Sequence, residues 1–228
     1  MTIHLQKEIE KLKTMILSMS ARVEKNFHDI SEAAIISDVE TANRVIKEEA
    51  QINDIELEIE EECLKSLALY QPVAVDLRLI VAILKINNEL ERINDFSVNI
   101  AERVLDLASL SNFETPFDIK GMSEKVGRML SMSLDALINM DPQLAIEVCN
   151  LDDEVDDQNK EIFAQVTTEI QKDPSRVKIM LQYASISRYL ERIADLASNI
   201  AEDVIYLVEG AIIRHQDIED LSEISHGD

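Results

Sequence analysis

Two segments one hundred residues apart carry the same acidic pattern. Residues 89–104 read ELERINDFSVNIAERV and residues 189–204 read YLERIADLASNIAEDV. On a helix, which turns by about 100° per residue, the oxygen-bearing side chains of each segment fall on one face and the apolar residues on the opposite face. These side chains are Glu91, Asp95, Asn99 and Glu102 in the first segment, and Glu191, Asp195, Asn199 and Glu202 in the second.

A bound cation would account for this pattern. Like charges four residues apart destabilise a helix by about 0.2–0.5 kcal/mol per pair, and a cation would remove that penalty. A face that serves only solubility tolerates Lys, Gln or Ser, whereas both segments keep the same acidic and amide residues. Carboxylate and amide oxygens suit hard or borderline cations such as magnesium, calcium, manganese and iron, while zinc more often takes imidazole. The repeat therefore predicts a metal site in each half.

One helix offers too few ligands, so a neighbouring helix has to contribute. The segment before each repeat supplies a second pair four residues apart, Glu49 with Asn53 in the first half and Asp152 with Asp156 in the second. We expect metal ligands at Glu49, Glu91, Asp95, Asp152, Asp156, Glu191 and Asp195, with Asn99, Glu102, Asn199 and Glu202 as supporting metal or polar contacts.

Arg92 and Arg192 stand inside the repeated pattern. Helix geometry favours pairing within their own helices, for example of Arg92 with Glu89 or Asp95, and capture of phosphate is the alternative. Gly121 and Gly127 are isolated and form no glycine-rich phosphate loop, so nucleotide hydrolysis is not expected.

A di-iron enzyme of the ferritin type is the competing metal-binding helical bundle. That class needs Glu-xx-His on two helices, and the sequence has this spacing once, at Glu223 and His226 in a polar tail. We therefore expect no catalytic residues and no enzyme.

Composition restricts the partners. The formal net charge of −23 argues against nucleic acid, because binding of phosphates rests on lysine and arginine. Cys63 and Cys149 lack a paired spacing and no apolar leader is apparent, so we expect a cytoplasmic protein without disulfides. Lys85 interrupts the most apolar run, Ile80 to Ile86, so any membrane association is peripheral and made through partners.

The apolar periodicity predicts an all-α protein of six helices. One apolar stripe runs through the first helix at Leu5, Ile9, Leu12, Ile16, Met19, Val23, Phe27 and Ile30. Helix breaks and N-caps such as Asp38, Asp141 and Asp173 place the helices at about residues 3–34, 38–69, 73–110, 119–139, 142–172 and 174–210.

Short connections within each set of three helices imply antiparallel bundles. We therefore expect two tandem homologous three-helix bundles, residues 1–110 and residues 111–228. The second ends in a polar tail, loosely held beyond His215.

The sequence resembles the PhoU family. The resemblance rests on the repeated LERI-x-D-xxx-NIAE pattern, on CLKSLALYQPVAVDLRLIVAILK at residues 63–85 and on EDVIYLVEG at residues 202–210. The family commonly has LERIGDHA where this chain has LERINDFS and LERIADLA, so both copies lack a glycine and a histidine of that pattern.

The resemblance implies two three-helix bundles with surface metal clusters, most often of iron, with zinc, manganese or magnesium as alternatives. The ligand pairs of the family map onto Glu91 with Asp95, Glu191 with Asp195, and Asp152 with Asp156, while Glu49 is followed by Asn53 in place of an aspartate.

In function the resemblance implies a regulator, not an enzyme. It would act with the ATPase of the phosphate ABC transporter and with the phosphate-sensing histidine kinase, and would repress phosphate uptake and starvation signalling. We also expect a homodimer. Two alternatives have no phosphate partner: a cation store or sensor, and a metal-free helical interaction module whose acidic residues form a solvated face.

Overall fold

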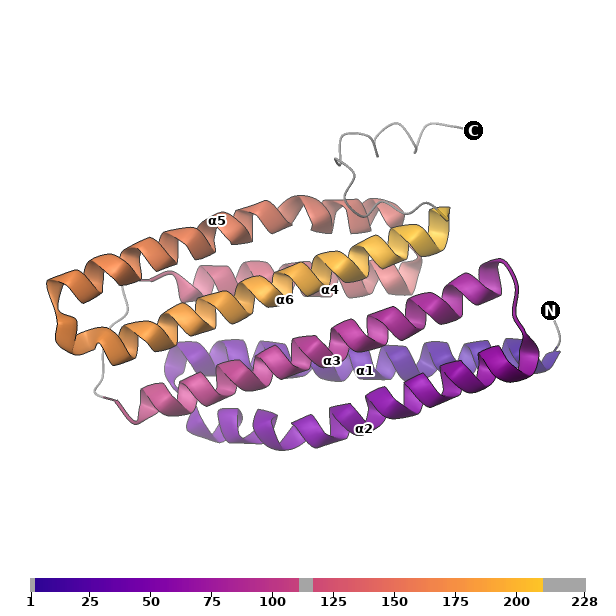
Figure 1. Ribbon diagram of the computed structural model, residues 1–228, viewed down its shortest axis with the longest axis horizontal. Coiled ribbons are helices and arrows are strands. Elements are labelled where there is room, and N and C mark those ends of the chain that lie inside the picture. Colours follow the sequence, from indigo (N-terminus) through magenta and orange to yellow (C-terminus); the bar gives the residue numbers. More distant parts are fainter. Residues whose placement is uncertain (1–2, 111–116, 211–228) are drawn as a thin grey trace.

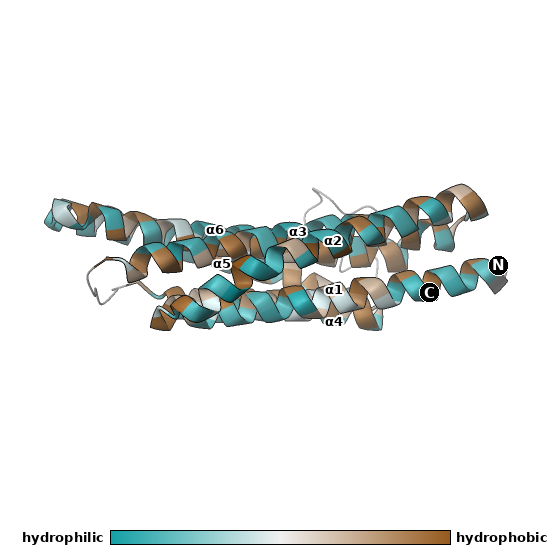
Figure 2. Cartoon of the chain, turned by 90° about the horizontal axis from the view of Figure 1, so that it is seen from below, coloured by the Kyte–Doolittle hydropathy of each residue, from teal (hydrophilic) through white to brown (hydrophobic). Residues whose placement is uncertain are grey.

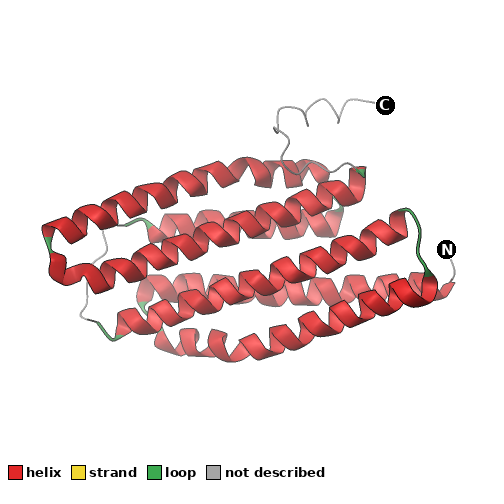
Figure 3. Ribbon diagram, viewed as in Figure 1, coloured by secondary structure: helices red, strands yellow, loops and turns green. Residues whose placement is uncertain are grey.

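The computed structural model describes residues 3–110 and 117–210. It contains the six predicted helices and no strand in these two ranges (Figures 1 and 3). The helices are α1 (Ile3–Ile36), α2 (Val39–Tyr70), α3 (Val75–Ala108), α4 (Ile119–Asn139), α5 (Pro142–Lys172) and α6 (Val177–Glu209), with a 3-10 turn, η1 (Pro174–Arg176), before α6. The prediction of an all-α chain with two sets of three helices is confirmed.

Aspartates begin α2 and α5 as the sequence predicts. The Asp38 carboxylate accepts hydrogen bonds from the backbone N–H groups of Glu40 and Thr41 at 3.0 and 3.2 Å. Asp141 caps α5 in the same way, and Pro142 follows it at the start of the helix. These caps satisfy N–H groups that have no partner inside the helix, and so they fix where each helix begins.

Two helices begin later than the sequence suggested. Gln71 and Ala74 adopt positive φ values of 45° and 49°, so the chain turns there and α3 begins at Val75 instead of residue 73. Asp173 caps the 3-10 turn η1, and the α-helical pattern of α6 begins only after it.

The helices form two layers. α2, α3, α6 and α5 lie side by side in one layer, and α1 and α4 form the other (Figures 1 and 2). α3 and α6 contact each other at the centre, and each also contacts both other helices of its own half. The two helices that carry the repeated acidic pattern are therefore the central pair of the four-helix layer.

The core lies between the layers. Every residue of the apolar stripe predicted for the first helix is buried. α3 and α6 bury the apolar side of their repeats, including Ile93, Ile100, Ile193 and Ile200. Burial of this face leaves the acidic side of each repeat directed away from the core, as the helical geometry predicted.

Contacts between α3 and α6 join the two halves. The rings of Phe96 and Tyr189 stack with their centroids 5.9 Å apart, and Lys85 Nζ lies 2.8 Å from Asp203 Oδ1. These contacts fix how the acidic faces of the two halves lie relative to each other.

The predicted boundary between residues 110 and 111 adjoins a segment outside the described ranges, and the two domains as delimited stay a prediction. The tail beyond His215, with Glu223 and His226, also lies outside the described residues. Among the described helices, none combines the length and the apolar character needed to span a bilayer.

Candidate metal sites

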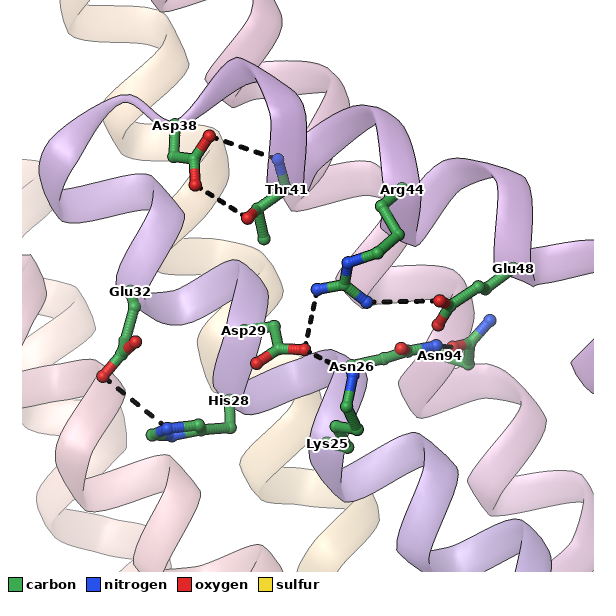
Figure 4. Close-up of polar contacts among 10 residues, drawn as sticks. All are labelled: Lys25, Asn26, His28, Asp29, Glu32, Asp38, Thr41, Arg44, Glu48 and Asn94. Atoms are coloured by element: carbon green, nitrogen blue, oxygen red, sulfur yellow. Dashed lines mark hydrogen bonds and ion pairs between the residues drawn. The ribbon is translucent and has the colours of Figure 1, made fainter.

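A polar network sets the position of α2 against α1 (Figure 4). Arg44 Nη2 on α2 lies 2.7 Å from Asp29 Oδ2 on α1, and Arg44 Nη1 lies 3.2 Å from Glu48 Oε1. On the α3 side, Asn26 Nδ2 donates a 3.0 Å hydrogen bond to Asn94 Oδ1. Glu49, the first predicted ligand of α2, directly follows Glu48 in this helix.

The most compact acidic group lies between α5 and α6. Asp156, Glu191 and Asp195 each offer a carboxylate oxygen, and these three oxygens all lie within 4.8 Å of one another. All three residues are half-buried. No other set of three His, Cys, Asp or Glu residues in the described ranges meets this spacing. The structure thus brings together three of the predicted ligands from two helices.

Asp152 lies one turn before Asp156 and extends this group. Burial raises the pKa of Asp152 to about 6, and the nearby negative charges of Asp195 and Asp156 add to the rise. Burial also raises the pKa of Glu191, with Asp195 as the next cause. The burial of these carboxylates and their closeness to one another both disfavour their charged forms, and a cation would relieve this.

Arg192 provides part of the charge balance in the second half. Its Nη1 lies 3.2 Å from Asp195 Oδ2, which confirms pairing within the helix. Its Nε lies 3.6 Å from Glu191 Oε2, yet that oxygen is inaccessible to solvent and accepts no hydrogen bond. A carboxylate oxygen without a hydrogen bond, next to two further carboxylates, fits a metal ligand.

The first half gathers its carboxylates around Glu91. Burial raises the pKa of Glu91, and the charges of Asp95, Glu56 and Glu49 raise it further, while Arg92 lowers it. Burial also raises the pKa of Asp95. The predicted residues Glu49, Glu91 and Asp95 therefore lie in one electrostatic neighbourhood on α2 and α3.

Glu56 is the residue that the sequence analysis missed. It lies seven residues after Glu49 on α2, a spacing of about two helical turns that places both on one face. Burial raises the pKa of Glu56, followed by the charge of Glu60. The seven-residue spacing was the available signal.

The predicted supporting residues behave differently from one another. Glu102 is exposed, and its Oε2 lies 3.1 Å from Nη2 of the neighbouring Arg103. Glu202 is half-buried, and burial followed by the charges of Glu202 and Asp152 raises the pKa of the Cys149 thiol to about 12. Asn99 and Asn199 are half-buried at matching positions. Glu102 is thus directed to an arginine, and Glu202 lies in the acidic neighbourhood of Asp152.

Arg92 connects the two neighbourhoods. Its Nη1 lies 3.3 Å from Glu89 Oε2, one of the two pairings predicted within the helix. Its charge also lowers the pKa of Asp195, whose pKa burial raises. Arg92 is on α3 and Asp195 is on α6, the two helices that contact each other at the centre of the layer.

Comparison with known proteins finds relatives that match nearly the whole chain. The PhoU domain family matches the chain twice, at residues 16–104 and 119–204. The chain is 38% identical over 217 residues to a phosphate-specific transport system accessory protein PhoU homolog of Aquifex aeolicus, and the alignment covers 95% of this chain and 98% of that protein.

Two solved structures have the same fold. The crystal structure of PhoU from Pseudomonas aeruginosa gives a TM-score of 0.87 at 37% identity, covering 90% of this chain and 99% of that one. The phosphate transport system regulatory protein PhoU from Streptococcus pneumoniae gives a TM-score of 0.84 at 27% identity, covering 91% and 98%. With its duplicated three-helix sets and two family matches, the chain belongs to the PhoU family.

Proposed function

We propose that the chain is a regulator of phosphate homeostasis without catalytic activity of its own. In this proposal it acts at the inner face of the membrane with the ATPase of the phosphate ABC transporter and with the phosphate-sensing histidine kinase, and it represses uptake and starvation signalling when phosphate is plentiful. The observation that carries the proposal is similarity along nearly the whole chain to proteins named as accessory or regulatory parts of phosphate transport.

The acidic faces of α2, α3, α5 and α6 are the proposed metal sites. Asp152, Asp156, Glu191 and Asp195 would hold metal in the second half, and Glu49, Glu91 and Asp95 in the first. Their support is the approach of three carboxylates between α5 and α6 and the Glu191 Oε2 atom, which is inaccessible to solvent and accepts no hydrogen bond. Iron is the metal expected by resemblance, with manganese or magnesium, which suit oxygen ligands, and zinc as alternatives.

The metal has a structural or regulatory role in this proposal. Binding would neutralise carboxylates that repel one another on neighbouring helices, and would so stabilise one arrangement of the acidic face. A homodimer is part of the proposal and is tested by the mass of the purified protein in solution.

The experiment measures binding of the purified chain to the transporter ATPase subunit and to the cytoplasmic part of the kinase. We expect saturable binding to both, and a weaker signal for Asp156→Asn/Asp195→Asn when the proteins are loaded with metal. Saturable binding to neither, at protein concentrations of tens of micromolar, would overturn the proposed partners.

A second candidate is a cation sensor or store, which the approach of Asp156, Glu191 and Asp195 favours. A sensor would change its oligomeric state or thermal stability over a defined range of metal concentration without any phosphate partner. If neither the oligomeric state nor the thermal stability changes with metal concentration, and the chain binds the transporter and the kinase, the sensor is excluded in favour of the phosphate regulator. A metal-free helical interaction module, the other alternative without a phosphate partner, would bind its own partner regardless of these acidic residues.

A further inference from the structure

The two halves carry matching acidic motifs on α3 and α6, but the preceding helices present different side chains to them. Asn87 Nδ2 on α3 donates a 2.9 Å hydrogen bond to the Glu56 carbonyl oxygen on α2. A hundred residues later, Ser187 Oγ on α6 donates a 2.7 Å hydrogen bond to Asn159 Oδ1 on α5. The buried apolar residues of the two helices repeat at the same spacing, so Glu56 and Asn159 occupy matching positions on α2 and α5; these buried residues are Val45, Ile52 and Ile59 on α2, and Val148, Val155 and Ile162 on α5.

This match identifies the counterpart of each ligand position. Three residues before Glu56 stands Asn53, and three residues before Asn159 stands Asp156. Asn53 therefore occupies the place in the first half that Asp156 occupies in the second. An amide stands where the other half has a carboxylate.

The number of carboxylates does not distinguish the halves. Each half offers four candidate ligand carboxylates: Glu49, Glu56, Glu91 and Asp95 in the first, and Asp152, Asp156, Glu191 and Asp195 in the second. Their arrangement does distinguish them, because three oxygens approach within 4.8 Å in the second half, and the described residues of the first half contain no such group.

The amide of Asn53 is one cause of the difference between the two halves. Its Oδ1 is inaccessible to solvent and has no hydrogen-bond partner among the described residues. An amide oxygen coordinates hard cations but carries no charge, so it attracts a cation less than the carboxylate of Asp156 does. Glu56 brings a carboxylate from the next turn of α2, but it stands at the position that matches Asn159 and not at the one that matches Asp156.

Arg192 acts against binding in the second half, because it pairs with Asp195 and a metal would compete with it. The side chains of Arg192 and Asp195 are 47% and 35% exposed, and ion pairs of such exposure contribute little. The arginine is therefore a weak competitor for a divalent cation held by three carboxylates.

We propose that the two halves are unequal metal sites, that Asp156, Glu191 and Asp195 load first, and that Asn53 keeps the first half weak. This inference rests on the metal binding in the proposed function and adds an order of loading to it. It also assigns Asn53 and Asp156 as the residues that determine this order.

The experiment titrates the full-length chain, stripped of metal by a chelator, with Mn²⁺ and measures free Mn²⁺ by electron paramagnetic resonance. Wild type should show a tight class of sites that Asp195→Asn weakens by at least about tenfold, the low end for damage to a metal site. The matched variant Asp95→Asn in the first half should leave this tight class unchanged. Helical content by circular dichroism controls for folding of every variant.

Exchange of the two residues gives the sharper test. Asn53→Asp should add a second class of tight Mn²⁺ sites. Asp156→Asn should remove the tight Mn²⁺ sites of wild type. In the double variant N53D/D156N, the tight class should become sensitive to Asp95→Asn and insensitive to Asp195→Asn.

The outcomes separate this inference from the proposed function. Two equal classes in wild type, or a tight class lost on Asp95→Asn and kept on Asp195→Asn, would overturn the inference and leave metal binding in place. Absence of tight Mn²⁺ binding from every variant would overturn the inference together with the metal-binding part of the proposed function.

Discussion

Lys85 on α3 and Asp203 on α6 form an ion pair, with Nζ and Oδ1 2.8 Å apart, that joins the two halves of the chain. The Asp203 side chain is 2% exposed, and the Lys85 ammonium also lies 5.1 Å from the centroid of the Tyr206 ring. Truncating one member of a buried pair is costly because the other charge stays buried. We therefore expect this ion pair to stabilise the packing of α3 against α6, the helices that carry the two acidic faces.

We expect Lys85→Met to lower the free energy of unfolding by about 2 kcal/mol, below the usual range for fully buried pairs because Lys85 is partly exposed. Urea denaturation followed by circular dichroism measures the change. Lys160→Met, which removes the exposed pair with Asp157, is the control and should leave the unfolding midpoint unchanged. Equal effects of the two substitutions would contradict the importance of the buried pair.

The network of Figure 4 predicts a pH-dependent contribution from Asp29. Burial acts to raise the pKa of Asp29, but hydrogen bonds and charges from Lys25 and Arg44 outweigh it, and the net shift is downward. Because the folded-state pKa lies below the unfolded value of 3.8, the stabilisation is present above that pH and is lost as the pH falls through the folded pKa.

Asp29→Asn should therefore lower the free energy of unfolding by about 1 kcal/mol at pH 7, and by less as the pH falls below about 4. Thermal unfolding over this pH range measures the difference from wild type. Asp54→Asn removes the same charge from an exposed position on α2 and serves as the control. If Asp29→Asn lowers the free energy of unfolding by the same amount at every pH, the ion pairs of Asp29 are not the cause of the destabilisation.

The contribution of Asp152 to folding stability should have the opposite pH dependence to that of Asp29. Burial and neighbouring carboxylates raise the pKa of Asp152 from 3.8 to about 6, so the folded state binds this proton more tightly than the unfolded state does. The group therefore favours folding at low pH, and this contribution is lost as the pH rises through about 6.

In metal-free protein, Asp152→Asn should raise the free energy of unfolding at pH 8 by about 1 kcal/mol, a value reduced by partial solvent exposure, and should have little effect at pH 4. Chemical denaturation at both pH values, in the presence of a chelator, measures this. Destabilisation by Asp152→Asn at pH 8 would contradict the expectation that the negative charge of Asp152 is unfavourable in the folded state.

Most of the fold follows from local signals in the sequence. The stripe from Leu5 to Ile30 predicts the buried face of α1 because helical periodicity alone decides which residues share a side. Asp38 and Asp141 mark helix starts because a cap acts on backbone groups within three residues. The start of α3 was misplaced because Gln71 and Ala74 adopt positive φ values, which their residue types do not favour.

The candidate site was less accessible to sequence reasoning. Spacing correctly places Glu191 and Asp195 on one face, and the structure brings Asp156 to them across the contact between α5 and α6. The distance between residues on two helices depends on helix rotation and register, which contacts such as Asn87 with Glu56 set. The sequence could therefore show that Asn53 differs from an aspartate, but not which oxygens approach one another.

The most direct test of the central claim measures phosphate uptake by the purified phosphate ABC transporter in proteoliposomes that also contain ATP and this chain on the ATPase side. The account predicts that metal-loaded wild type lowers the uptake rate in a saturable way and that Asp156→Asn/Asp195→Asn, folded to the same extent, lowers it less. An uptake rate that stays the same with saturating wild type would contradict the proposed repression of phosphate transport.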